Sequence, residues 1–178
     1  MQFLNTIQAM QKLGTNVVTE ARSNLKKEKK QTRENTLYND MNYVVTADNT
    51  SVDLEWRFGR AADYWDFVNE GVKGSGGFKG SGKMRGQGSP YSFKKKNIAK
   101  GVVLKWIANK PLKLRNAKGQ FKEKTQANLK TAAFLIGRAI AQRGLTRTLF
   151  FDNAYNKEVA KAENKITEAF AEDLELQI

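Results

Sequence analysis

Few residues of this chain could do chemistry. The sequence contains no histidine and no cysteine, which removes the commonest general base, the thiolate nucleophile and most structural zinc sites. Asp53 and Glu55 resemble the acidic metal-binding pair of a nuclease. They alternate with apolar residues, however, so we expect both carboxylates on the solvent-facing side of a strand. Because no other acids stand at metal-ligand or nucleophile spacing, we expect no enzyme activity, no metal and no cofactor.

Residues 77–84 approach the pattern of a phosphate-binding P-loop. Gly77-Phe-Lys-Gly-Ser-Gly-Lys matches its first seven positions, but Met84 stands where a Ser or Thr hydroxyl would hold magnesium. No apolar strand precedes Gly77, and residues 85–90, with two glycines and a proline, cannot begin the helix whose N-terminus would face a phosphate. We therefore do not expect this loop to bind a nucleotide.

The chain changes character at Gly71. Residues 61–68 predict a short helix that Gly71 ends, and its apolar face consists of Ala61, Tyr64, Trp65 and Val68, with Phe67 beside them. From residue 71 to residue 88 there are eight glycines, and each loses more backbone entropy on ordering than another residue would. Loops of this length are functional or disordered in isolation. We expect this one to stay mobile until a partner orders it.

Charge is distributed unevenly. The net charge is +13, yet residues 71–151 hold nineteen Lys or Arg and a single acid, Glu123, whereas residues 152–178 hold seven acids and three lysines. A basic block of this size favours phosphate or an acidic protein surface as its partner. The cations that we expect to contact acidic protein or DNA are Lys94, Lys95, Lys96, Lys110, Lys113 and Arg115.

Tyr91 and Phe93 precede the first three of these lysines. Aromatic rings next to cations are typical of proteins that bind single-stranded nucleic acid, because rings stack on bases while lysines follow the backbone. The same two rings could instead face the core from one short strand, with the lysines in solvent. The sequence leaves both interpretations open.

The remaining pattern predicts an α+β fold with a long N-terminal helix, a small antiparallel sheet and several packed helices. Residues 2–30 form the long helix, whose apolar positions are Phe3, Ile7, Met10, Leu13 or Gly14, Val17, Ala21 and Leu25. Residues 41–47 and 51–58 form a hairpin with its turn at 48–50. The inward-facing residues of its second strand are Val52, Leu54, Trp56 and Phe58.

Three helices follow the glycine-rich loop. The first spans 98–108, with Ile98, Val102, Val103, Trp106 and Ile107 on its apolar face. The second begins after an N-cap at Thr125 and ends at Gly144, and its apolar residues are Leu129, Ala132, Ala133, Leu135, Ile136, Ala139 and Ile140. Asp152 should cap the third, after a connector that anchors Phe150 or Phe151. Leu174 and Leu176 alternate with polar residues and predict a short edge strand.

We expect a single domain over residues 1–178. Its segments are an N-terminal helix and arm at 1–35, a hairpin and aromatic turn at 36–70, a glycine-rich basic loop at 71–96, a helical part at 97–170 and a C-terminal tail at 171–178. No run approaches the roughly 18 apolar residues that span a bilayer, and the N-terminus lacks the features of a signal peptide. We expect a cytoplasmic protein with no membrane contact.

The order of elements resembles the tail-completion or neck proteins of tailed bacteriophages. The features that carry the likeness, over residues 1–170, are the first helix, the hairpin, the Ala62–Gly71 turn, the glycine-rich loop, the Ala133–Ile140 helix, Gly144, Phe150-Phe151 and a final helix. Glu70 and Gly71 fit the family motif. Val72 stands where that motif commonly has a small hydroxyl residue, and the lysine-rich stretch at 94–124 is longer than the family pattern.

The resemblance implies a virion structural protein without enzyme activity. Such a subunit forms a homo-oligomeric ring that joins head to tail around the DNA channel, assembles in the host cytoplasm, and contacts other neck, tail and portal proteins. The residues that we expect at its subunit interface are Tyr64, Trp65, Phe67, Glu70, Gly71, Phe78, Tyr91 and Phe93. The alternative is a basic nucleic-acid-binding protein that uses the Lys/Arg-rich block at 73–147.

Overall fold

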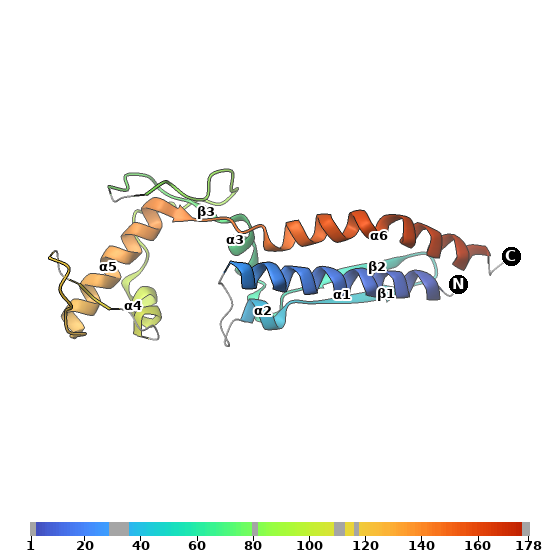
Figure 1. The fold of residues 1–178 in the computed structure, drawn as a ribbon, viewed down its shortest axis with the longest axis horizontal. Helices are drawn as coiled ribbons and strands as arrows, with labels where there is room; N and C mark the ends of the chain where they lie inside the picture. Colours follow the sequence, from blue (N-terminus) through green and yellow to red (C-terminus); the bar gives the residue numbers. More distant parts are fainter. Residues whose placement is uncertain (1–2, 29–35, 80–81, 109–112, 116–117, 176–178) are drawn as a thin grey trace. The chain divides into compact units, whose positions relative to one another are not determined.

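The computed structural model describes residues 3–28, 36–79, 82–108, 113–115 and 118–175 (Figure 1). It confirms the α+β class, with a long N-terminal helix, a small antiparallel sheet and several packed helices. Contacts group the chain into two compact units, which we call unit 1 (residues 1–69 and 148–178) and unit 2 (residues 70–147). The sequence predicts a single domain instead. The difference arises because the middle of the chain builds a core of its own, around Val103, Ile107 and Ala133.

Unit 1 consists of two long helices and a hairpin. Its elements are α1 (Leu4–Lys27), α2 (Thr36–Asp40), β1 (Asn42–Ala47), β2 (Val52–Arg57), a 3-10 turn at Gly59–Ala61, α3 (Trp65–Glu70) and α6 (Phe150–Glu175). Helices α1 and α6 lie side by side (Figure 1). They run antiparallel, because Asn24 of α1 donates to the Phe150 carbonyl oxygen (3.1 Å) at one end, while Asp173 accepts hydrogen bonds from the start of α1 at the other.

The predicted apolar face of α1 forms the core of unit 1. Leu13, Val17, Ala21 and Leu25 are buried there with Phe150 and Phe151 from the start of α6. Gly14 is buried where α1 crosses the hairpin, and a Cβ at this position would lie 2.4 Å from the Tyr43 ring. Only glycine therefore allows this close approach of α1 to β1. The helix predicted at residues 2–30 is confirmed over its described part.

The hairpin is confirmed with the expected alternation. Its antiparallel register pairs Asn42 with Arg57 and Ala47 with Val52. The Asp48 carboxylate closes the turn by accepting from the backbone N–H groups of Thr50 (2.6 Å) and Ser51 (2.8 Å). In β2 the inward residues are half-buried or buried and the intervening polar residues are exposed.

The aromatic turn differs from the predicted helix at 61–68. The backbone first forms a 3-10 turn, with i to i+3 hydrogen bonds that end on Tyr64, and α3 begins only at Trp65. Gly59 enters this turn with a φ of +50°, a left-handed conformation that favours glycine. The helix is therefore shorter and starts later than its apolar spacing suggests. Gly71, at a φ of +69°, follows its last residue as expected.

Both ends of α6 differ from the sequence prediction. The helix begins at Phe150, so Asp152 lies in its first turn rather than at the N-cap. The cap comes from α3 instead, since Asn69 Oδ1 accepts from the Phe151 N–H (3.1 Å). At the other end the helix continues through Glu175, so the edge strand predicted around Leu174 is wrong. Leu176 lies outside the described residues.

Unit 2 contains β3 (Val72–Lys73), α4 (Lys100–Ala108), α5 (Gln126–Arg143) and β4 (Gly144–Leu145). Thr125 caps α5, accepting from the Asn128 N–H (3.3 Å), and Gly144 at a φ of +90° ends it, both as predicted. The two short strands pair antiparallel. The apolar faces are predicted only in part, because Val102, Trp106 and Leu135 are 63%, 48% and 56% exposed.

Candidate functional site

Two of the aromatic residues predicted at a subunit interface pack inside unit 1. The Trp65 ring stacks on Phe58, with ring centroids 4.1 Å apart and an interplanar angle of 4°, and it meets Phe151 edge to face at 5.6 Å. The Tyr64 hydroxyl makes a hydrogen bond with Thr36. Phe67 differs from them, because 42% of its surface is exposed. Tyr64 and Trp65 hold the fold, and Phe67 is the most exposed of the three.

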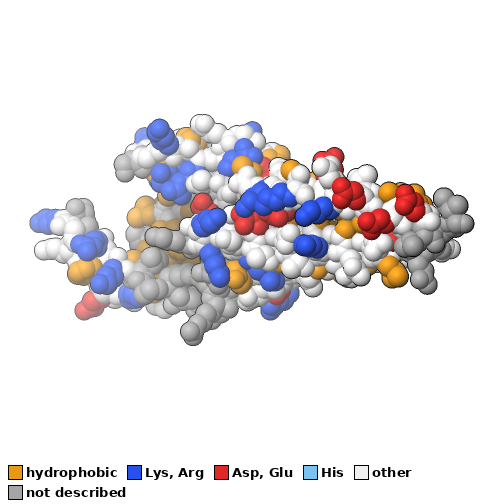
Figure 2. Space-filling model, turned by 45° about the vertical axis from the view of Figure 1, so that its right-hand side comes forward, with side chains coloured by type: hydrophobic (Ala, Val, Ile, Leu, Met, Phe, Trp, Pro, Cys, Tyr) orange, Lys and Arg blue, Asp and Glu red, His pale blue; other side chains and the backbone are white. Residues whose placement is uncertain are grey.

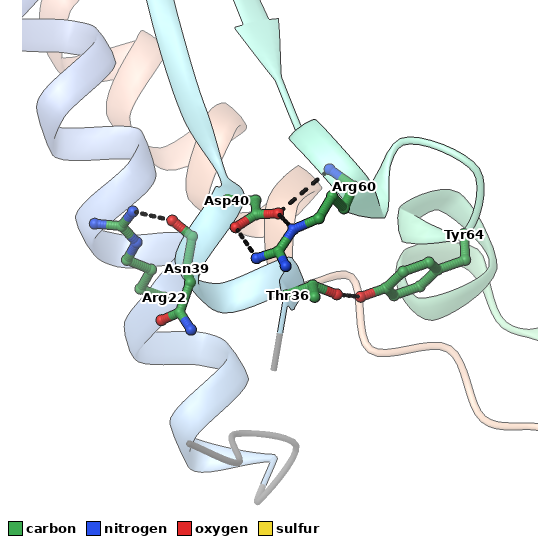
Figure 3. A network of polar contacts seen from close by, with 6 residues as sticks. All are labelled: Arg22, Thr36, Asn39, Asp40, Arg60 and Tyr64. Atoms are coloured by element: carbon green, nitrogen blue, oxygen red, sulfur yellow. Dashed lines mark hydrogen bonds and ion pairs between the residues drawn. The ribbon is translucent and has the colours of Figure 1, made fainter. Parts of the chain in front are cut away.

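A polar network fixes the backbone beneath this turn (Figure 3). Two side-chain nitrogens of Arg60 donate hydrogen bonds to the Asp40 carboxylate, at 2.7 and 3.0 Å. The backbone N–H of Arg60 donates to the same carboxylate (3.3 Å). The Arg60 guanidinium lowers the pKa of Asp40 below its ordinary value. From α1, Arg22 donates to the carbonyl oxygens of Asn39 (3.4 Å) and Met41 (2.9 Å). Arg60 thus joins the 3-10 turn to α2, and Arg22 joins α1 to α2 and to Met41 just after it, so the network has a structural role.

Next to this turn, unit 1 presents an aromatic hollow. We use this name for the adjoining hollows of about 600 and 340 Å³ whose aromatic lining is Trp56, Phe58, Trp65, Phe151 and Tyr155. Trp56 meets Phe151 edge to face at 5.3 Å and Tyr155 at 6.2 Å. Glu55 and Arg57 line one part of the hollow, and Asp152 lines the other. The result is an apolar floor with charged groups beside it.

Glu70 and Gly71 stand at the start of unit 2 and have internal roles. Glu70 pairs with Arg147 at 3.1 Å. A Cβ on Gly71 would lie 2.6 Å from the Arg147 nitrogen and from the Leu145 oxygen, both in the backbone. Glu70 and Gly71, at the first end of unit 2, therefore pack against Leu145 and Arg147 at its last end.

In its described part, the glycine-rich loop is hydrogen-bonded to other residues of unit 2. Ser75 and Gly76 donate their N–H groups to the carbonyl oxygens of Ala141 (2.9 Å) and Gln142 (3.2 Å) near the end of α5. Arg85 donates to Arg143 (2.8 Å) in the same way. Gly86 lies against β3, since a Cβ there would be 2.2 Å from the Val72 oxygen. The prediction that a partner must order these residues is wrong, because the carbonyl groups at the end of α5 supply the acceptors.

Phe78, Tyr91 and Phe93 are all half-buried in unit 2. The Arg143 guanidinium lies over the Phe78 ring, 5.6 Å from its centroid. Tyr91 and Phe93 flank Ser92, which forms an isolated bridge with Lys73 of β3. The Lys73 N–H donates to the Tyr91 carbonyl oxygen (2.8 Å), and the Phe93 N–H donates to the Lys73 carbonyl oxygen (2.9 Å). This arrangement favours the short-strand interpretation of Tyr91 and Phe93.

The predicted cations of unit 2 separate into two groups. Lys94, Lys95 and Lys96, which we call the lysine triplet, are exposed directly after the bridge and make no ion pair with the described residues. Lys113 and Arg115 instead lie over the exposed Phe121 ring, with 5.5 and 4.2 Å to its centroid. Lys110 lies outside the described residues.

Charge differs strongly between the two units. The sequence of unit 2 holds nineteen Lys or Arg and two acids, Glu70 and Glu123, whereas unit 1 holds twelve Lys or Arg and sixteen acids. Figure 2 shows acidic side chains gathered toward the C-terminal end of α6. Among the α6 acids, Glu168, Glu172 and Glu175 are exposed, while Asp173 is buried.

The acidic pair considered for nuclease chemistry lies on the exposed face of β2, as expected. Asp53 accepts from the Ser51 hydroxyl (3.0 Å), and Glu55 pairs with Arg57 at 2.9 Å, which lowers the pKa of Glu55. Both carboxylates are exposed. Across the described ranges, no three acids gather in a geometry that could hold a metal ion.

The aromatic hollow and two remote caps are the features that sequence reasoning missed. The hollow draws its rings from β2, α3 and α6, and the Phe150-Phe151 pair was its one visible signal. Asp173 accepts from the backbone N–H groups of Asn5 (3.0 Å) and Thr6 (2.8 Å), and so caps α1 from α6. No local pattern reveals such a cap.

Comparison with known proteins identifies no relative: no family model matches the chain, and neither a curated protein nor a solved structure is significantly similar to it. None of the helices in the described residues is both long and apolar enough to cross a membrane.

Proposed function

We propose that the chain is a structural subunit of a bacteriophage neck or tail, which assembles into a ring around the DNA channel as a tail-completion or head-tail joining protein. The observation that carries the proposal is the separation of charge between two compact units. Unit 2 carries a net +17, and unit 1 a net −4. The order of elements that resembles neck proteins agrees with this role.

Charge separation favours a head-to-tail contact. Two copies of unit 2 repel each other, whereas unit 2 of one copy attracts unit 1 of another. A contact between two different faces is heterologous, and it repeats from copy to copy until the rotation closes a ring. Such a protein works as a binding scaffold and needs no catalytic group.

Exposed apolar residues on unit 2 fit the same role. Helix α4 has apolar residues on several sides, but only Val103 and Ile107 are buried against α5. Val102 and Trp106 remain exposed on the adjacent side. A helix that is apolar over most of its circumference is normally covered on more than one side, which favours a further protein of the neck as a second partner.

The test is the mass of the purified protein by light scattering at about 50 and 500 mM salt, with and without DNA. The proposal predicts a discrete oligomer whose mass does not depend on DNA, and closed rings by electron microscopy. A chain that stays single at both salt concentrations and over a wide range of protein concentration would overturn it.

The alternative function is nucleic-acid binding by the basic block at 73–147. The exposed lysine triplet favours this alternative. A protein that neutralises about six to ten phosphates loses roughly 10³ to 10⁵ fold in affinity between 50 and 200 mM salt. Fluorescence anisotropy with labelled DNA across this range measures the slope, and a flat response would exclude the alternative.

A further inference from the structure

We propose that the aromatic hollow of one copy receives the lysine triplet of a second copy. The inference rests on the proposed assembly function and names the two surfaces that meet. It assigns a binding site for a cationic side chain to unit 1, and it assigns the ligand to residues 94–96 of unit 2.

The floor of the hollow suits a cation. Five aromatic rings line it, and the centroid distances from Phe151 to Trp56 and Trp65 are 5.3 and 5.6 Å. Tyr155 is 40% exposed, so an incoming side chain can reach its ring. Aromatic faces carry negative potential and attract ammonium and guanidinium groups within about 6 Å of the centroid.

The carboxylates beside the floor suit the same ligand. Asp152 lines the hollow next to Tyr155 and makes no ion pair with the described residues. Glu55 lines it on the β2 side, paired there with Arg57 (2.9 Å). A lysine has a four-carbon stem that packs on apolar surface and an ammonium group that reaches polar surroundings. The hollow offers a partner for each part of that side chain.

The lysine triplet is the segment of this chain that fits best as the ligand. Its three side chains are exposed and consecutive, and within the described residues they have no acidic partner. The two hydrogen bonds between Lys73 and its neighbours Tyr91 and Phe93 fix the backbone that presents them. A segment held in place in the free protein loses less entropy on binding than a mobile one.

The contact between hollow and triplet joins two different surfaces, so it is heterologous and can repeat from one copy to the next. After one hollow has received one triplet, the first copy still has a free triplet and the second copy still has a free hollow. The same contact can then repeat around a ring. Two variants that each lack one of the two surfaces should therefore restore a single contact when they are mixed. A general loss of stability would not produce this result.

The experiment uses two full-length variants. The first, Lys94→Gln/Lys95→Gln/Lys96→Gln, loses the triplet and keeps the hollow. The second, Asp152→Asn/Tyr155→Ala, loses part of the hollow and keeps the triplet. We expect each alone to associate at least roughly tenfold more weakly than the wild type. An equimolar mixture should form a species of two chains and no larger one, because it contains one intact hollow–triplet pair. Light scattering and sedimentation velocity measure both results.

Matched controls separate charge and folding from the specific contact. Lys118→Gln/Lys122→Gln/Lys124→Gln removes the same charge from exposed positions of unit 2, and it should assemble like the wild type. Phe121→Ala removes an exposed ring outside the hollow with the same expected result. Should the second variant lose its circular dichroism spectrum, Trp56→Leu replaces it, because leucine keeps an apolar side chain in β2.

Each outcome decides between the inference and the proposed function. If the wild type stays a single chain, both are wrong. If the wild type forms rings and the triplet variant still does, or if the mixture stays as single chains, the hollow–triplet contact is wrong while the ring remains. A triplet variant that assembles normally but no longer binds DNA would assign the lysines to nucleic acid and overturn the inference.

Discussion

Replacing Asp173 by asparagine should destabilise unit 1, although this residue stands near the end of the chain. Its carboxylate is buried and accepts three hydrogen bonds at the start of α1, from the N–H groups of Asn5 and Thr6 and from the Thr6 hydroxyl (2.7 Å). Asn5 and Thr6 lie 168 and 167 positions before Asp173 in the sequence. Asp173 therefore caps one long helix and fastens the second helix to it.

The expected loss is about 2 kcal/mol. Asparagine keeps one acceptor oxygen but puts an amide NH2 in place of the other, so a buried donor at the start of α1 loses its acceptor, which costs about 1–3 kcal/mol. The loss of a negative charge near a helix N-terminus adds about 0.3–1 kcal/mol. Asparagine keeps the size and nearly the helix propensity of aspartate, so neither a cavity nor propensity confuses the comparison. The midpoint of thermal unfolding should fall by about 4–8 °C for a chain of this size.

The effect should depend on pH with a defined sign. Burial alone would raise the pKa of Asp173, but the hydrogen bonds from Thr6 and Asn5 hold this pKa below its ordinary value. A carboxyl with a lowered pKa in the folded state contributes stability above its unfolded value, near pH 4, and loses this contribution as pH falls through the folded value. The difference between wild type and Asp173→Asn should therefore be full at pH 7 and shrink toward pH 3.

Urea unfolding followed by circular dichroism measures the free energy, and hydrogen exchange of an N-terminal peptide reports on the Asn5 and Thr6 amides. Glu172→Gln is the matched control, because it removes a neighbouring charge that is exposed. A variant Asp173→Asn that unfolds within about 0.5 kcal/mol of this control, the usual range for surface changes, would refute the capping argument.

Three further experiments test the packing and capping described above. Gly14→Ala should destabilise by about 1–3 kcal/mol despite the better helix propensity of alanine, because the new Cβ would lie 2.4 Å from the Tyr43 ring; urea unfolding checks this, and an unchanged or higher stability would contradict it. Asn69→Ala should cost about 1–2 kcal/mol, because it removes the buried acceptor of the Phe151 N–H, and a loss equal to that of an exposed Asn153→Ala would count against the cap. Gly86→Ala and Gly77→Ala form a matched pair, because both have a left-handed φ (+67° and +72°) but only Gly86 has backbone within 4 Å; only Gly86→Ala should release the Ser75 and Arg85 amides to hydrogen exchange, and equal exchange in both variants would show that the segment does not pack against β3.

Local patterns predicted the elements of this fold well. The alternation of Val52, Leu54 and Trp56 identified β2 and its inward face, because a strand exposes every second residue. Thr125 and Gly144 marked both ends of α5, because each of these two caps acts on backbone next to it in the sequence. The apolar spacing of α1 identified the face that lies in the core of unit 1.

Contacts distant in sequence could not be predicted in the same way. Asn69 caps α6 from 82 positions away, and Asp173 caps α1 from still farther. The acceptors that order Ser75 and Gly76 lie at the end of α5, and no pattern in the glycine-rich loop indicates them. The aromatic hollow likewise needs three elements to meet. The division into two units follows from such contacts.

The most direct test of the proposed ring-forming role is the mass of the wild-type protein in solution. Light scattering at about 50 and 500 mM salt, with and without DNA, distinguishes screened charge attraction from a built interface. We predict a discrete oligomer at the lower salt, whose mass is the same with and without DNA, and which loses mass at the higher salt because screening weakens the contact between the charged units. A single chain under all four conditions, which binds DNA at low salt and releases it steeply as salt rises, would contradict the proposed role and favour the nucleic-acid-binding alternative.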